Sequence, residues 1–171
     1  MGKGYLKIAV TGHRPDKLGG YSATENFKAI RRHMRSWLQL QQTLSSKLRP
    51  EKPTLISGGA LGIDQFWMEV GLYLELPVIA AIPFLGYDAK WPLSSRQEYK
   101  ELLDQCHEVL YISEPGYDAT KLQIRNKWMV DECDLLVAYW DGSKGGTKNC
   151  YDYAVERGKP IERFNPKDII L

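Results

Sequence analysis

The sequence has few cysteines and no long apolar run. Its three cysteines, Cys106, Cys133 and Cys150, are odd in number and none pairs at CxxC spacing, which argues against a disulfide framework and a structural zinc site. No apolar stretch reaches the ~18 residues that a membrane-spanning helix needs. The apolar run near the N-terminus is too short for the core of a signal peptide. These features predict a cytoplasmic protein that does not enter a membrane.

An excess of charge of either sign is also missing. The chain has 23 Lys and Arg against 21 Asp and Glu, a net charge of +2, so its overall charge favours neither nucleic acid nor membrane as a partner. Hydrophobic residues make up 43% and charged residues 26% of the 171 positions, which is ordinary for a folded domain. We expect one domain over residues 1–171.

Short apolar runs alternate with longer amphipathic segments along the chain. The apolar runs predict strands over 6–10, 54–57, 77–82, 108–112, 134–139 and, as a short last strand, 160–163. Apolar residues at helical spacing predict helices over 24–48, 63–75, 94–105, 119–133 and 149–157. Nearly continuous apolar strands separated by helices indicate an α/β fold, a doubly wound and mainly parallel sheet with helices on both faces, as in Rossmann-like proteins. Such folds bind ligands at the carboxyl ends of their strands.

The first strand end carries Thr11, Gly12, His13 and Arg14. Gly12 allows the backbone to approach a ligand closely, and Arg14 offers a planar set of donors to phosphate or carboxylate. His13 can donate a hydrogen bond or transfer a proton. A plain strand-to-helix turn with a surface arginine has the same composition, so both interpretations stay open.

The second strand end is the run SGGALGID, which contains Ser57, Gly58, Gly59, Ala60 and Asp64. Glycines between a strand and a helix predict a nest of backbone N–H groups for an anion. Asp64 is a candidate acceptor for ribose hydroxyls. It could equally hold the loop closed or stabilise the start of the helix.

A second glycine-rich turn follows the fifth strand, and its candidate ligand-binding residues are Asp141, Gly142, Gly145, Gly146 and Thr147. Thr147 can cap a helix or bind a phosphate. Neither turn matches GxGxxG or GxxxxGK[ST], the patterns of dinucleotide dehydrogenases and P-loop NTPases. Two anion-binding turns on one sheet edge predict a nucleotide-like small molecule as the ligand.

Three further groups of residues are candidates. Arg125 and Asn126, on the helix before the fifth strand, reach the ligand from the side or lie on a solvated helix face. In the loop after the third strand, the candidates to stack on a base are Pro83, Phe84 and Trp91. A basic stripe at helical spacing is either a solvated face or a surface for nucleic acid or an acidic partner, and its residues are Lys28, Arg31, Arg32 and Arg35.

These motifs together resemble the SLOG superfamily, in particular its small stand-alone bacterial and phage-type members. The run from Ser57 to Asp64 is similar to the SGGAxGID loop of DprA/Smf proteins, and Gly145-Gly146-Thr147 is similar to the GGT turn of LOG phosphoribohydrolases. The resemblance implies a Rossmann-like fold that binds nucleotides or nucleotide-derived ligands, as a homodimer or higher oligomer. We expect no cofactor and no metal site.

The resemblance leaves three functions open. The first is a sensor or sequestering protein that binds a nucleotide without turning it over. The second is an N-glycosidase acting on a nucleoside monophosphate or an NAD-like nucleotide, with Asp64 and Arg125 as the catalytic residues. LOG enzymes have a glutamate three residues after the GGT threonine, and this chain has Cys150 there. The third is a single-stranded nucleic-acid binder that uses the basic stripe.

Overall fold

The computed structural model describes residues 6–48 and 51–170. Within this part of the chain, six strands form a single sheet in the order β4-β3-β2-β1-β5-β6, and every pairing is parallel. The strands are β1 Lys7–Gly12, β2 Thr54–Ser57, β3 Val78–Ile82, β4 Glu108–Tyr111, β5 Leu135–Tyr139 and β6 Ile161–Phe164. The predicted α/β, doubly wound architecture is confirmed.

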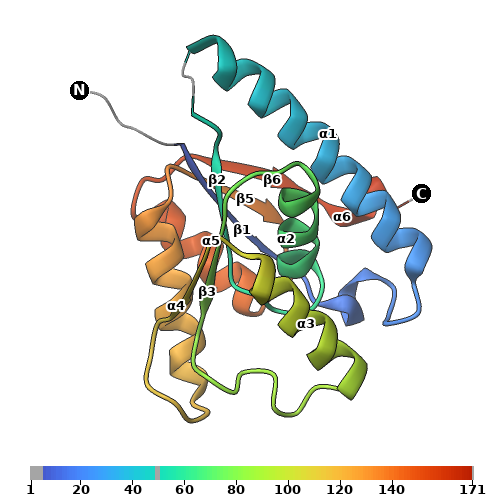
Figure 1. Ribbon diagram of the computed structural model, residues 1–171, viewed down its shortest axis with the longest axis vertical. Helices are drawn as coiled ribbons and strands as arrows, with labels where there is room; N and C mark the ends of the chain where they lie inside the picture. Colours follow the sequence, from blue (N-terminus) through green and yellow to red (C-terminus); the bar gives the residue numbers. More distant parts are fainter. Residues whose placement is uncertain (1–5, 49–50, 171) are drawn as a thin grey trace.

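Helices cover both faces of the sheet (Figure 1). On one face lie α1 Thr24–Leu48, α2 Ile63–Tyr73 and α3 Leu93–Gln105, and on the other lie α4 Ala119–Glu132 and α5 Gly146–Glu156. A 3-10 turn, Pro15–Leu18, follows β1, and a short helix, α6 Pro166–Ile169, follows β6. None of the described helices has the length and apolar character needed to cross a bilayer.

Each strand supplies side chains to two cores, since successive residues of a strand point to opposite faces. In β1, Ile8 and Val10 are fully buried in the core beneath α1, α2 and α3. Ala9 between them belongs to the smaller core beneath α4 and α5, which also contains Cys133 and Cys150. A sheet buried on both faces explains why the strands are nearly continuous apolar runs.

Most predicted elements differ from the structure by one or two residues at their ends. Two differences concern element ends that carry candidate site residues. The strand expected at 6–10 continues to Gly12, because Thr11 and Gly12 still pair with Ala138 and Tyr139 of β5. The helix expected from residue 149 begins at Gly146, so part of the expected turn is the first helical turn. The Pro15–Leu18 turn and α6 were not predicted.

The strand order places a switch point between β1 and β5. From β1 the chain winds outward through β2, β3 and β4, and then returns to the other side of β1 to form β5 and β6. The connections after β1 and β5 therefore diverge and leave a crevice at the carboxyl ends of these two strands. Ligands of open α/β sheets bind in this position.

Candidate functional site

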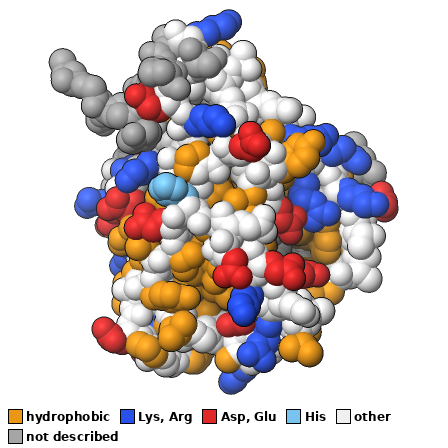
Figure 2. All heavy atoms as spheres, in the orientation of Figure 1, with side chains coloured by type: hydrophobic (Ala, Val, Ile, Leu, Met, Phe, Trp, Pro, Cys, Tyr) orange, Lys and Arg blue, Asp and Glu red, His pale blue; other side chains and the backbone are white. Residues whose placement is uncertain are grey.

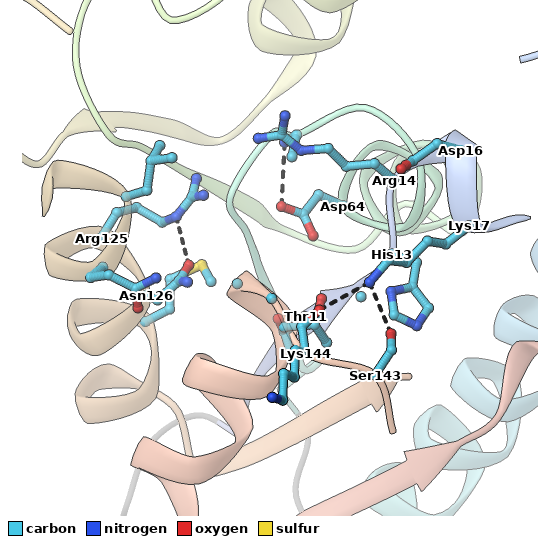
Figure 3. A pocket seen from close by; sticks show the side chains of 18 of the residues that line it. Thr11, His13, Arg14, Asp16, Lys17, Asp64, Arg125, Asn126, Ser143 and Lys144 are labelled. Carbon is cyan, nitrogen blue, oxygen red and sulfur yellow. Dashed lines mark hydrogen bonds between the residues drawn. The ribbon is translucent and has the colours of Figure 1, made fainter. Parts of the chain in front are cut away.

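A cavity of about 360 Å³ lies at this switch point. Figure 3 shows its side chains converging from the end of β1, the β2–α2 loop, α4 and the β5–α5 loop. Its lining contains four basic side chains, Arg14, Lys17, Arg125 and Lys144, and two acidic ones, Asp16 and Asp64. A cavity with this balance favours an anionic ligand.

The start of α5 forms one wall of the cavity. Gly145, at the N-cap, has φ +142°, a conformation that favours glycine, and Gly146 is the first helical residue. No side chain among the described residues caps this helix. The first N–H groups of a helix lack intrahelical partners and carry a partial positive charge, so this wall can bind an anion.

Arg125 forms the opposite wall and is buried, with 5% of its surface exposed. Its Nε donates to Asn126 Oδ1 at 3.0 Å, and its Nη1 donates to the carbonyls of Gly58 and Ala81. Nη2 has no hydrogen-bond partner in the described part of the chain. The guanidinium is thus fixed on one side and keeps free donors on the other.

Asp64 lies between Arg14 and Arg125 in the view of Figure 3. Its carboxylate accepts a hydrogen bond from the Ala60 N–H at 3.3 Å, so it does hold the loop closed, one of the roles expected for it. Burial raises the pKa of Asp64, against the opposing effect of Arg125, the Ala60 hydrogen bond and Arg14. The cavity therefore contains a carboxyl group that holds its proton more tightly than an exposed aspartate does.

The glycine loop after β2 bonds mainly to itself. The Gly59 N–H donates to Ser57 Oγ at 3.2 Å, and the Ser57 hydroxyl donates to the Asp64 carbonyl at 2.7 Å. With the Ala60 N–H bound to Asp64, two backbone amides of the loop, those of Gly59 and Ala60, are already paired. Ala60 and Asp64 line the cavity, whereas Ser57, Gly58 and Gly59 are not part of its lining. The idea that this loop is an anion nest remains a prediction.

His13 joins the ends of β1 and β5. Its Nε2 lies 2.8 Å from Asp141 Oδ1. Hydrogen bonds from Ser143, together with His13, hold the pKa of Asp141 below its ordinary value despite partial burial. The Asp141 backbone N–H also lies 3.0 Å from Nε2 and can donate to it, so this one ring nitrogen meets both the side chain and the backbone of Asp141. Burial lowers the pKa of His13, which keeps the imidazole neutral. This pair fixes the geometry of the switch point.

Asp16 and Lys144, named above in the lining, were not predicted from the sequence, and two further residues that the sequence did not single out contribute to the site. Lys17, in the 3-10 turn after β1, donates from Nζ to Ser143 Oγ at 2.9 Å and to the Lys144 carbonyl at 3.0 Å, across the cavity mouth. Tyr87 accepts from Arg14 Nη2 at 3.1 Å, and its ring centre is 5.8 Å from the Arg125 guanidinium. Tyr87 lies in the loop after β3, in which the sequence predicts Pro83, Phe84 and Trp91 as the residues that stack on a base.

Of the candidate residues, the cavity collects Thr11, Gly12, His13, Arg14, Ala60, Asp64, Arg125, Asn126, Gly145, Gly146 and Thr147. The residues expected to stack on a base lie outside its lining. Phe84 is buried and packs edge-on against Tyr87, and Trp91 packs between Tyr87 and Tyr99. Asp141 and Gly142 also lie outside the lining. Among the described residues, no cluster of His, Cys, Asp or Glu could hold a metal ion.

Gly12 is the point where the cavity and α2 meet. A Cβ atom at this position would come within 2.6 Å of Ile63 Cβ, closer than packed atoms approach. Glycine here lets the first turn of α2 rest on the end of β1. This close approach brings Asp64, the neighbour of Ile63, into the cavity.

The fold and the site define a Rossmann-like α/β protein with a polar, mainly basic cavity at its switch point. The sequence profile of the YspA SLOG family matches residues 8–168. The chain belongs to this family, as the strand-end motifs predicted at superfamily level.

Relatives of the chain include prophage and bacterial proteins. The SPbeta prophage-derived protein YoqJ of Bacillus subtilis is 34% identical over 136 residues, which cover 69% of this chain and 80% of YoqJ. The UPF0398 protein BH1768 of Halalkalibacterium halodurans is 24% identical over 170 residues, covering 96% and 86%.

Solved structures share the fold at low sequence identity. DNA processing protein A (DprA) of Streptococcus pneumoniae has a TM-score of 0.66 at 19% identity; the match covers 93% of this chain but only 50% of that protein. The molybdenum cofactor binding protein of Rippkaea orientalis has a TM-score of 0.59 at 16% identity, covering 96% and 78%. A Helicobacter pylori DprA, described for its single-stranded DNA binding mode, has a TM-score of 0.63 at 19% identity, covering 95% and 70%.

Proposed function

We propose that this chain binds a nucleotide or a nucleotide-derived ligand in the switch-point cavity and acts as a sensor or a sequestering protein. The observation that carries the proposal is the buried Arg125 guanidinium, whose Nη2 lacks a partner among the described residues. Arg125 lines the cavity, and its Nη2 is not among the fully buried atoms that lack a partner, so Nη2 is accessible from the cavity. A guanidinium held in place by its other nitrogens can donate a charge-assisted hydrogen bond to a ligand oxygen there.

The ligand's charged and polar groups can be assigned to the two walls. A phosphate fits against the uncapped start of α5, where Lys144 and the amides of Gly146 and Thr147 lie. In this proposal Arg125 donates to a second anionic or carbonyl oxygen of the ligand, and Asn126 and Asp64 bind its sugar hydroxyls. A volume of about 360 Å³ is within the range of small-molecule sites.

Proteins of the same fold bind such different partners as single-stranded DNA and the molybdenum cofactor, according to their descriptions. This range supports a binding role for the fold and does not select the ligand. The nucleotide assignment rests on the cavity itself. The expected homodimer also stays a prediction, which light scattering on the purified protein tests.

One observation favours a second candidate function, hydrolysis of an N-glycosidic bond. Asp64 is a cavity carboxyl whose pKa is raised by burial, and a raised pKa suits a carboxyl to donate a proton to a departing base. Its Oδ2 already accepts from Ala60, which leaves the other oxygen for this role.

The test is a panel of nucleoside mono- and diphosphates, NAD, ADP-ribose and cyclic nucleotides, with melting temperature and free base measured on the same samples. A ligand at about 100 times its Kd stabilises the native state by ~2.7 kcal/mol. For a domain of this size that raises Tm by about 5–10 °C. A shift without free base supports the binding protein, and free base supports the glycosidase. No shift with any compound contradicts the proposal.

Gly146→Asp tests whether the binding occurs in this cavity. A Cβ at Gly146 meets no atom within 4 Å, and an aspartate in the first turn suits the helix dipole, so the variant should fold normally. Its carboxylate would repel a phosphate at the start of α5, and we expect at least a hundredfold loss of affinity. Gly146→Ala, which adds the Cβ without charge, is the matched control. Equal affinity in both variants would place the ligand elsewhere.

A further inference from the structure

A groove between α1 and α2 is separate from the switch-point cavity, and no described residue lines both. Its volume is about 400 Å³. Figure 2 shows Lys and Arg side chains gathered over α1, with carboxylates among them. The lining consists of the whole basic stripe of α1 together with three residues of α2, namely Lys28, Arg31, Arg32, Arg35, Glu69, Val70 and Tyr73.

The stripe is therefore not simply a solvated helix face. Arg31 Nη1 lies 3.3 Å from Glu69 Oε2, and the Arg31 guanidinium sits 5.1 Å from the centre of the Phe66 ring. The Arg35 guanidinium sits 5.7 Å from the centre of the Tyr73 ring. These contacts hold the two arginine side chains along the groove instead of leaving them free in solvent.

Only part of the stripe's charge is available to a partner. Glu69 compensates Arg31, and Glu25 compensates Lys28 at 3.1 Å. Arg32 and Arg35 have no carboxylate partner within residues 6–48 and 51–170. A nucleic-acid strand gains its affinity from many phosphate contacts at once, and two uncompensated arginines beside two carboxylates are a poor surface for it. Two arginines are well suited to two separate carboxylates, each bound through paired N–H groups.

The groove also has an apolar side. Val70 lies in its lining and is 5% exposed, while the Tyr73 ring is 70% exposed beside it. Arg32 and Arg35 are three positions apart on α1, so their side chains emerge on neighbouring turns of one face. The groove thus offers two cationic heads, the Arg35 guanidinium held over the Tyr73 ring and the exposed Arg32 guanidinium, next to an aromatic ring and an aliphatic floor.

We propose that this groove docks an acidic segment of a protein partner. Two carboxylates of the segment bind Arg32 and Arg35, and an aliphatic side chain between them packs on Val70 and Tyr73. This surface is independent of the nucleotide site and would give the protein a second partner.

The probe is a fluorescent helical peptide of about 15 residues, long enough for helix formation, with Glu and Leu on one face. Its comparison peptides have Leu replaced by Ala, or Glu replaced by Lys. Binding is followed by fluorescence anisotropy. We expect the Glu–Leu peptide to bind, the Lys peptide not to bind, and the Glu–Ala peptide to bind at least tenfold more weakly.

The double substitution Arg32→Glu, Arg35→Glu should lower the affinity for the Glu–Leu peptide at least tenfold. Lys47→Glu with Lys90→Glu makes the same charge change at two exposed positions outside the groove and should leave affinity unchanged. Tyr73→Ala should remove the advantage of the Glu–Leu peptide over the Glu–Ala peptide.

Three results would overturn the proposal. The first is that the Glu–Leu peptide does not bind the wild type. The second is that it binds the Arg32→Glu, Arg35→Glu variant as tightly as the Lys47→Glu, Lys90→Glu control. The third is that oligothymidylate binds the wild type more tightly than the peptide does and loses this binding in the Arg32→Glu, Arg35→Glu variant. The last result would make the groove a nucleic-acid surface. Nucleotide binding in the cavity should be unchanged in all these variants, so a failure here leaves the first proposal intact.

Discussion

Replacing Arg125 by methionine should destabilise the protein by about 3–5 kcal/mol, because two buried carbonyls lose a donor and a buried carboxyl loses the cation that lowers its pKa most. The carbonyls belong to Gly58 and Ala81, in parts of the chain far from α4. The carboxyl is Asp64, whose pKa Arg125 lowers against the effect of burial. Methionine roughly preserves the volume of the side chain, so most of the cost comes from polar groups.

The contribution of Asp64 can be separated by a double-mutant cycle. Asp64→Asn removes the charge and keeps an oxygen for the Ala60 N–H. In this background Arg125→Met should cost at least 1 kcal/mol less than in the wild type, since no buried carboxylate is left without its cation. The free energies come from urea unfolding of all four proteins.

The pH dependence gives an independent check. A carboxyl with a raised pKa in the folded protein costs stability once the pH rises above its pKa in the unfolded chain, and the cost grows up to the folded pKa. Arg125→Met raises the pKa of Asp64 further, so the stability gap between wild type and variant should be constant at low pH and widen once the pH exceeds the pKa of Asp64 in the folded wild type. A cost below ~1 kcal/mol, or an additive cycle with a constant gap, would refute the role given to Arg125.

Three other changes test neighbouring parts of the site. Gly12→Ala should cost at least 1–3 kcal/mol by overpacking against Ile63 (roughly the range for crowded cores), and Ile63→Ala should recover part of it in unfolding experiments. Asp141→Asn should reduce stability at pH 7 and progressively less as the pH falls below about 4, because the low pKa of Asp141 stabilises the fold only where the unfolded carboxyl is ionised; a gap independent of pH would contradict this. Lys17→Met should leave stability within ~1 kcal/mol but speed hydrogen exchange in the loop after β5, and unchanged exchange would show that the lysine does not hold that loop.

Much of the fold was predictable because parallel strands buried on both faces are readable as apolar runs. The elements that were missed are single turns with weak periodicity. The signal for α6 was present, since Asn165 caps the helix and Pro166 follows at its first position. The early start of α5 was hidden by Gly146, a residue that disfavours helix interiors.

The candidate site was predictable to the extent that it follows strand ends. Thr11 through Arg14 and the turn before α5 had to meet at one edge once the strands were parallel. Lys17 and Tyr87 could not be foreseen, because their contacts depend on how two long connections fold back over the cavity. The partners of the basic stripe were hidden for a similar reason, since Glu69 and Tyr73 belong to a different helix.

The strand order has a consequence for the order in which the protein becomes functional. The cavity draws its lining from Thr11 at one extreme to Thr147 at the other. During synthesis, a chain that has completed four strands has two thirds of the strands of the sheet and only part of the cavity lining. Arg125 arrives later, and the start of α5 arrives last. The cavity is therefore complete only when β5 has inserted beside β1, so on the proposed function a bound ligand reports that both halves of the sheet have been joined.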